Sequence, residues 1–214
     1  MRTNSLLIIA CIVASFWAWQ QDPKFAEQNI LFSFNNLMNG RYWTLLAALF
    51  VHGSVLHLFG NMLFLFVFGG TLQSSIGPAR YLTVFLTGGL AGFVLSLPFV
   101  DPNAGMVGAS AAIFTVAACV MLVRPLKFSW LFLAPQGLVA LLYFLYNVLL
   151  AYDPQVIPGY DPQVSYIAHV IGFVAGIPFG IAWSNDWKKN LLITLVLLGV
   201  YVAVLRILAG ALQR

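Results

Sequence analysis

Seven apolar stretches run along the chain. A membrane-spanning helix needs about 20 predominantly apolar residues, and in lipid each backbone amide must be satisfied within its own segment. We therefore predict that every stretch is a helix. The stretches cover Leu6–Trp19, Val55–Leu72, Tyr81–Val100, Gly108–Val123, Trp130–Tyr152, Ser165–Trp183 and Leu191–Ala209. The fourth is short for a span, which suits a helix that begins below the membrane surface, at the floor of a cavity.

The connection between the first two stretches is long and partly apolar. Its run Trp43–Val51 cannot cross hydrocarbon, so we predict an interfacial or partly embedded loop there. The neighbouring Asn35–Gly40 is predicted to be a turn. The first stretch is interpreted as a retained span and not as a cleaved secretory signal, because it stays apolar beyond Cys11 as far as Trp19.

The composition agrees with a protein whose main solvent is lipid. Hydrophobic residues make up 61% of the chain and charged residues 7%, whereas a soluble domain has roughly 25% charged residues. A large water-exposed domain is thereby excluded. The basic residues are scattered, so no basic stripe predicts binding to nucleic acid. Cys11 and Cys119 lie inside apolar runs and are predicted to be free, buried thiols.

The basic residues in the loops predict an orientation. If the N-terminus is cytoplasmic, the inner side receives Arg2, Arg80, Arg124, Lys127, Lys188 and Lys189. The outer side receives Lys24 and Arg41, with Arg206 and Arg214 at the carboxyl end. This bias has the sign of the positive-inside rule. We predict a multi-pass protein of the cell or plasma membrane with its N-terminus inside and its C-terminus outside.

The few polar residues within the spans fall at similar depth on the outer side. His57 and Asn61 are four residues apart and share one helix face, while Ser110 lies in the first turn of its helix. His169 lies about one turn inside the sixth stretch, whose small residues Ala168, Gly172, Gly176 and Gly180 permit close helix packing. That packing would bring Ser110 within reach of His169, which is the arrangement of a serine nucleophile and its base.

The other polar groups define what such a site could do. His57 and Asn61 could donate hydrogen bonds to a developing oxyanion. No carboxylate lies inside any span, so the residues predict a dyad whose histidine is oriented by packing. The same residues also fit structural hydrogen bonds between helices or a helix cap. From the residues alone, a catalytic dyad and structural polar contacts both remain open.

Three motifs resemble those of the rhomboid family of intramembrane serine proteases, in the same order. They are His52-x4-His57-x3-Asn61, Gly108-Ala109-Ser110-Ala111 and Ala168-His169-x2-Gly172-x3-Gly176. The segment Gly77–Tyr81 is also similar, and the likeness runs from about Trp43 to Gly180.

The resemblance implies a role for each matching residue. Ser110 would be the nucleophile and His169 the general base, with the Ser110 amide, His57 and Asn61 forming the oxyanion hole. The supporting residues would be His52, Gly108, Phe114, Gly172 and Gly176; among them the Phe114 ring would pack on His169, and Gly172 and Gly176 would allow close packing. The substrates would be transmembrane proteins, cleaved in or beside their spans without a metal or cofactor.

The implied fold is all-α, a polytopic helical membrane protein. Residues 1–184 would form a six-helix rhomboid core, and residues 185–214 an additional C-terminal transmembrane helix. The active site would open to the outer side, with His52 and Ser54 helping to wet its mouth. The span Trp130–Tyr152 and the loop Asp153–Val164 would form a gate for substrates that enter laterally.

Two positions depart from the family pattern, and two other functions compete. Thr44 follows Trp43 where an arginine is usual, and Gln73 stands where a glutamate is common, which questions how the first loop is anchored. A non-catalytic rhomboid-like binder of client helices is one alternative, although the complete dyad argues against it. A transporter is another, disfavoured because no span contains Asp or Glu. The sequence leaves the oligomeric state open.

Overall fold

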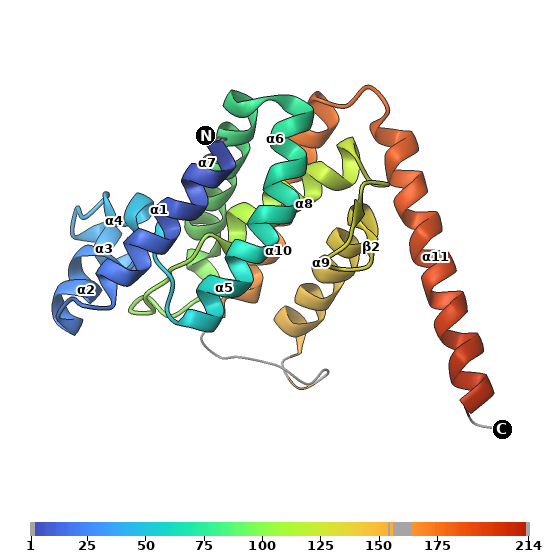
Figure 1. Cartoon of the computed structure of the whole chain (residues 1–214). Coiled ribbons are helices and arrows are strands. Elements are labelled where there is room, and N and C mark those ends of the chain that lie inside the picture. Colours follow the sequence, from blue (N-terminus) through green and yellow to red (C-terminus); the bar gives the residue numbers. More distant parts are fainter. Residues whose placement is uncertain (1–2, 154, 156–163, 213–214) are drawn as a thin grey trace.

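The structure is a computed structural model that describes residues 3–153, 155 and 164–212 (Figure 1). Its helices are α1 (Thr3–Ala18), α2 (Pro23–Asn29), α3 (Phe34–Met38), α4 (Thr44–Phe50), α5 (Val55–Phe64), the π-helical turn η1 (Leu65–Gly69), α6 (Gly70–Ile76), α7 (Pro78–Ser96), the 3₁₀ turn η2 (Leu97–Phe99), α8 (Ser110–Val123), α9 (Gln136–Tyr152), α10 (Tyr166–Ala182) and α11 (Trp187–Leu212). Two short antiparallel strands, β1 (Phe128–Ser129) and β2 (Ala134–Pro135), precede α9.

Each predicted apolar stretch contains a helix. Among the described residues, three helical runs are long and apolar enough to cross a membrane: Val55–Ile76, Pro78–Phe99 and Trp187–Leu212. The other four apolar helices, α1, α8, α9 and α10, are shorter. The arrangement is consistent with a helical membrane protein.

Three predicted elements are wrong in part. The predicted loop Trp43–Val51 is mostly helix α4 (Thr44–Phe50). The beginning of the predicted helix Trp130–Tyr152 belongs to the β1–β2 hairpin, and α9 starts only after Pro135. The predicted turn over Asn35–Gly40 is largely helix α3, because the Ser33 hydroxyl caps it by accepting a hydrogen bond of 3.1 Å from the Asn36 amide. Hydrophobicity alone gives no sign of the hairpin or of α3.

Helix α8 is the centre of the bundle (Figure 1). Its residues from Ala111 to Leu122 are all buried, and it packs most extensively on α10 and α7. This explains why an entirely apolar helix can be short: its neighbours cover it on every side and its ends need not reach the membrane surfaces.

The packing of α10 on α8 brings backbone against backbone. A Cβ atom at Gly172 would collide with the Ala111 carbonyl group. The same closeness lets the Thr115 hydroxyl donate a hydrogen bond of 2.7 Å to the Gly172 carbonyl oxygen. One turn further along, the Cys119 thiol lies 3.2 Å from the Gly176 carbonyl oxygen. The small-residue stripe of α10 therefore faces α8.

The first loop is anchored by an asparagine at its centre. The Asn36 amide group donates to the carbonyl oxygens of Glu27 and Leu31 at 2.7 and 2.8 Å. Arg41 donates to the Asn36 side-chain oxygen at 2.9 Å, and the Thr44 hydroxyl donates to the Arg41 carbonyl oxygen at 2.7 Å. Arg41 and Thr44 thus both help to hold this loop.

Gln73 ties α6 to α1. Its side-chain oxygen accepts a hydrogen bond of 2.7 Å from the Asn4 backbone amide. The Asn4 side chain donates to the carbonyl oxygen of Leu65, where the π-helical turn begins, and accepts from the Tyr81 hydroxyl. An uncharged glutamine is sufficient here because its partner is a backbone N–H group.

Helix α11 extends away from the bundle along most of its length (Figure 1). Near its start, Asn190 donates a hydrogen bond of 2.8 Å to the Leu122 carbonyl oxygen at the end of α8, and Thr194 is buried. Beyond that point its side chains are mostly exposed. The division of the chain into a core over residues 1–184 and an added helix over 185–214 stays a prediction.

The closeness of α10 and α8 can be tested by adding a side chain between them. Gly172→Val should lower the melting temperature in detergent, because overpacking of this contact costs about 1–3 kcal/mol or more. Gly199→Val is the matched control, since Gly199 also lies in a helix but a Cβ there meets nothing within 4 Å. Equal melting temperatures for the two variants would contradict the described packing.

Candidate active site

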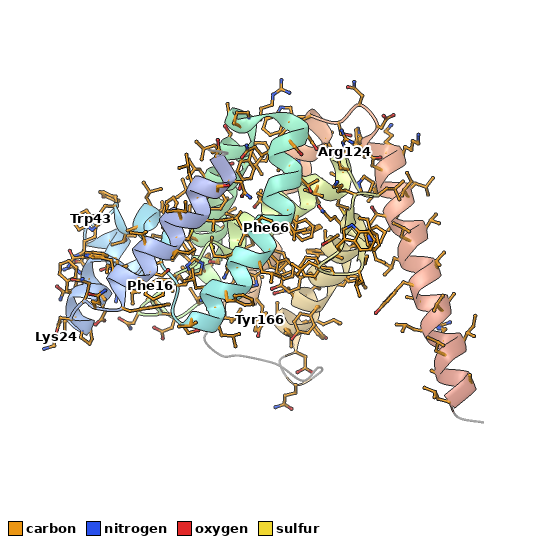
Figure 2. All side chains as sticks on the ribbon, viewed as in Figure 1. Phe16, Lys24, Trp43, Phe66, Arg124 and Tyr166 are labelled. Atoms are coloured by element: carbon orange, nitrogen blue, oxygen red, sulfur yellow. The ribbon has the colours of Figure 1, made fainter. Side chains whose placement is uncertain are left out.

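A cavity of about 280 Å³ opens among α5, α8, α9 and α10. It contains the four residues that the sequence predicts as the dyad and oxyanion hole: Ser110, His169, His57 and Asn61. The remaining lining residues are Leu56, Gly60, Phe64, Ile113, Phe114, Tyr143, Tyr146, Asn147, Val164 and Tyr166. Figure 2 shows Tyr166 and Arg124 toward opposite ends of the bundle, so the cavity lies away from the end where α8 terminates.

Ser110 is the first residue of α8. The amides of a helix's first turn have no partner within the helix, and the local field there favours negative charge. Gly108 precedes it with a φ of 115°, a conformation that glycine adopts readily. A Cβ at Gly108 would lie only 2.9 Å from the His57 ring, so glycine is needed for space as well as for conformation.

His57 and Asn61 lie one turn apart on α5. The Ser54 hydroxyl caps this helix by accepting from the His57 amide at 3.1 Å. The Gly53 amide donates to the His57 Nδ1 atom at 3.4 Å, which places the ring proton of neutral His57 on Nε2. The Asn61 amide group donates one hydrogen to the His57 carbonyl oxygen at 2.9 Å and has a second hydrogen to donate. Both side chains are therefore hydrogen-bond donors on the cavity wall.

His169 is buried on α10 and is held on two sides. The Phe114 ring stacks on it, with a centroid distance of 4.7 Å and an interplanar angle of 13°. Its Nδ1 atom lies 2.7 Å from the Asn147 Oδ1 atom, within hydrogen-bond distance. Packing on Phe114 holds this histidine as predicted, and a side-chain amide from α9, which was not predicted, holds it as well.

Asn147 is the residue at the site that sequence reasoning missed. A signal was present, because it is the only asparagine in the apolar stretch Trp130–Tyr152, where a polar residue is costly. Nothing in the sequence places it opposite His169, since the two belong to different helices and match no common motif.

Ser110 and His169 line the same cavity. Among the described residues, no hydrogen bond joins the Ser110 hydroxyl to the His169 ring. Catalytic hydrogen bonds are often long or poorly aligned in the absence of substrate and tighten when it binds. The arrangement is that of a serine at a helix start with a histidine across one small cavity.

His52 is not at the mouth of the cavity, so the prediction that it wets the entrance is wrong. It is fully buried, with its ring edge-on to His57 at a centroid distance of 5.1 Å. Its Nε2 atom accepts from the Ala109 amide at 3.4 Å, and its Nδ1 atom lies 3.1 Å from the Ser15 hydroxyl. His52 thus connects α1 to the residue before Ser110.

Burial keeps His52 neutral, which predicts a pH dependence of stability. Burial and the nearby His57 lower the pKa of His52 from 6.5 to about 3. Between these values the unfolded chain binds a proton that the folded protein does not, so stability should fall as the pH is lowered below about 6.5. The contribution of one such group is about 1.4 kcal/mol per pH unit.

Melting temperatures of wild type and His52→Gln in detergent between pH 5 and pH 8 measure this effect. Glutamine does not titrate, so the variant should lose less stability on acidification than wild type does. Parallel curves for the two proteins would show that His52 is protonated equally in the folded and unfolded states.

Comparison with known proteins identifies the family. Residues 39–186 match the Rhomboid domain. RHOMBOID-like protein 7 of Arabidopsis thaliana is 29% identical over 153 residues, which are 69% of this chain and 46% of the relative. Rhomboid-related protein 2 of Mus musculus is 30% identical over 155 residues, 70% of this chain and 51% of the relative.

A bacterial relative aligns over nearly the whole chain. Rhomboid protease GluP of Bacillus subtilis (strain 168) is 25% identical over 209 residues, 95% of this chain and 40% of that protein. The chain thus spans about half or less of the length of these relatives. The match to the Rhomboid domain covers most of the chain and includes every residue of the predicted site. The chain belongs to the rhomboid family.

Proposed function

We propose that this protein is an intramembrane serine endopeptidase that cleaves peptide bonds in or near transmembrane segments of other membrane proteins. The observation that carries the proposal is the shared cavity: Ser110, His169, His57 and Asn61 come from three helices and line one small space. The family also contains a relative named as a protease.

The residues can carry out the reaction in two steps, formation of an acyl-enzyme and its hydrolysis. His169 takes the proton of the Ser110 hydroxyl as Oγ attacks the scissile carbonyl carbon, and then delivers that proton to the leaving amine. Water attacks the resulting acyl-enzyme, with His169 again acting as base, and Ser110 regains its proton as the acid product leaves. The dyad is thereby restored without a cofactor or metal ion.

The negative charge that develops on the substrate oxygen would be met by hydrogen-bond donors. The Ser110 amide at the start of α8, the His57 Nε2–H group and the second Asn61 amide hydrogen are the donors proposed for this role. In a site shielded from bulk water, each such donor is worth about 10²- to 10³-fold in kcat.

The proposed orientation places the cavity on the outer side of the membrane, with the N-terminus inside. Helices α5, α8 and α10 all begin at the cavity, since its lining includes Leu56, Ser110 and Tyr166. All described lining residues precede residue 185, so the proposed core over residues 1–184 would contain the entire site. None of the described residues of α11 lines the cavity.

The dyad is tested by cleavage of a detergent-solubilised transmembrane substrate. Ser110→Ala and His169→Ala should each lower kcat by at least about 10³-fold, and the double variant should be little worse than either alone. Ser96→Ala is the matched control, because Ser96 is a buried serine outside the cavity. If both dyad variants cut as well as wild type, the assignment is wrong.

Lateral entry of the substrate between α5 and α9 is a second part of the proposal. Rings of the two helices meet there, with Phe64 stacked on Tyr143 at a centroid distance of 4.6 Å. Most of the predicted covering loop Asp153–Val164 lies outside the described residues.

Cross-links between α5 and α9 test lateral entry. A disulfide engineered between the two helices, in a background without Cys11 and Cys119, should abolish cleavage of a transmembrane substrate. Reduction of that disulfide should restore cleavage. Undiminished cleavage by the cross-linked protein would exclude this route.

A further inference from the structure

Resting on the proposed function, we propose that Asn147 is a positioning residue that holds His169 in the tautomer able to accept the Ser110 proton. The site would then work as a serine, a histidine and an orienting amide contributed by α8, α10 and α9. This role belongs to a residue outside the three motifs of the sequence.

The orientation of the Asn147 amide is fixed by its own helix. Its Nδ2 atom donates a hydrogen bond of 2.8 Å to the Tyr143 carbonyl oxygen, one turn earlier in α9. A carbonyl oxygen can only accept, so the NH₂ group must face Tyr143. The Oδ1 atom is left to face His169, at 2.7 Å from Nδ1.

This orientation determines where the imidazole proton lies. An amide oxygen can only accept a hydrogen bond, so the Nδ1 atom of His169 must carry the proton. A neutral imidazole has one ring proton, and Nε2 is therefore unprotonated. To act as general base for Ser110, His169 needs an unprotonated nitrogen that does not face Asn147, and Nε2 is that nitrogen.

The His169 ring is also held by a stack of aromatic rings that begins on α9. Tyr143 stacks on Phe114 at a centroid distance of 4.6 Å, and Phe114 stacks on His169 at 4.7 Å. The stack restricts tilting of the imidazole, and the hydrogen bond to Asn147 restricts its rotation within the plane. Asn147 is 1% exposed, so water does not compete for this hydrogen bond.

An amide suits this position because no carboxylate is available to orient His169. The described residues that line the cavity include no Asp or Glu. The amide dipole stabilises the imidazolium that forms during the reaction, while avoiding the large cost of a buried, unpaired carboxylate before it forms. Since Asn147 belongs to α9, the base is held correctly only while α9 is packed against α10.

Two substitutions at Asn147 test the role through kcat, KM and the pH profile of cleavage by the full chain in detergent. Asn147→Leu keeps the branched shape of the side chain but cannot accept a hydrogen bond, so kcat should fall by roughly 10²-fold or more with little change in KM. Asn147→Asp keeps the acceptor and should retain most activity at high pH. Its carboxylate stabilises the imidazolium, so the acid limb of the profile should move to higher pH. Leu145→Ala, at an exposed position of α9, should leave all three quantities unchanged.

The outcomes separate this inference from the proposed function. If Ser110→Ala and His169→Ala are inactive but Asn147→Leu has the kcat of wild type, Asn147 does not position the base. If Asn147→Leu does not fold, Asn147→Asp decides: an acid limb identical to that of wild type overturns the role. If the Ser110 and His169 variants remain active, it is the proposed function itself that fails.

Discussion

The contact between the backbones of α8 and α10 is the constraint on which the rest of the structure depends. Gly172 and Gly176 have no side chain where the carbonyl groups of Ala111 and Thr115 approach, so the two helices pack without an intervening layer. The Thr115 hydroxyl, placed in this seam, bonds to α10 directly. Because this packing fixes α10 along α8, it places His169 on the same cavity as Ser110.

A short, buried α8 follows from the same arrangement. Its neighbours supply the apolar surroundings that lipid would otherwise provide, so its first residue can lie within the bundle. A helix start in that place offers its first-turn amides to the cavity. A longer α8 that reached the membrane surface would move these amides into the solvent, where they would contribute far less.

Much of this organisation could be predicted from the sequence because lipid limits where polar groups can occur. Polar side chains are costly within the spans, so the positions of His57, Asn61, Ser110 and His169 made them candidate site residues, and the structure brings all four to one cavity. The family was identifiable from three ordered motifs and is confirmed by the match over residues 39–186. The positions of the long helices followed from hydrophobicity, whereas the short helices α3 and α4 and the hairpin before α9 did not.

The parts that could not be predicted depend on contacts between helices distant in sequence. His52 looks like a polar residue at a loop entrance, yet Ser15 and the Ala109 amide enclose it. In the sequence Asn147 is an isolated asparagine, and its contact with His169 depends on the rotation of α9 relative to α10. Spacing along one helix shows which residues share a face, but it does not show what that face meets.

The central claim is that Ser110 is a nucleophile activated by His169. Reaction of the detergent-solubilised protein with a fluorophosphonate, followed by peptide mapping by mass spectrometry, tests it most directly. The account predicts one adduct, on Ser110, which forms in wild type and is lost in His169→Ala and after denaturation. An adduct on another residue, or equal labelling of Ser110 in the His169→Ala variant, would contradict it.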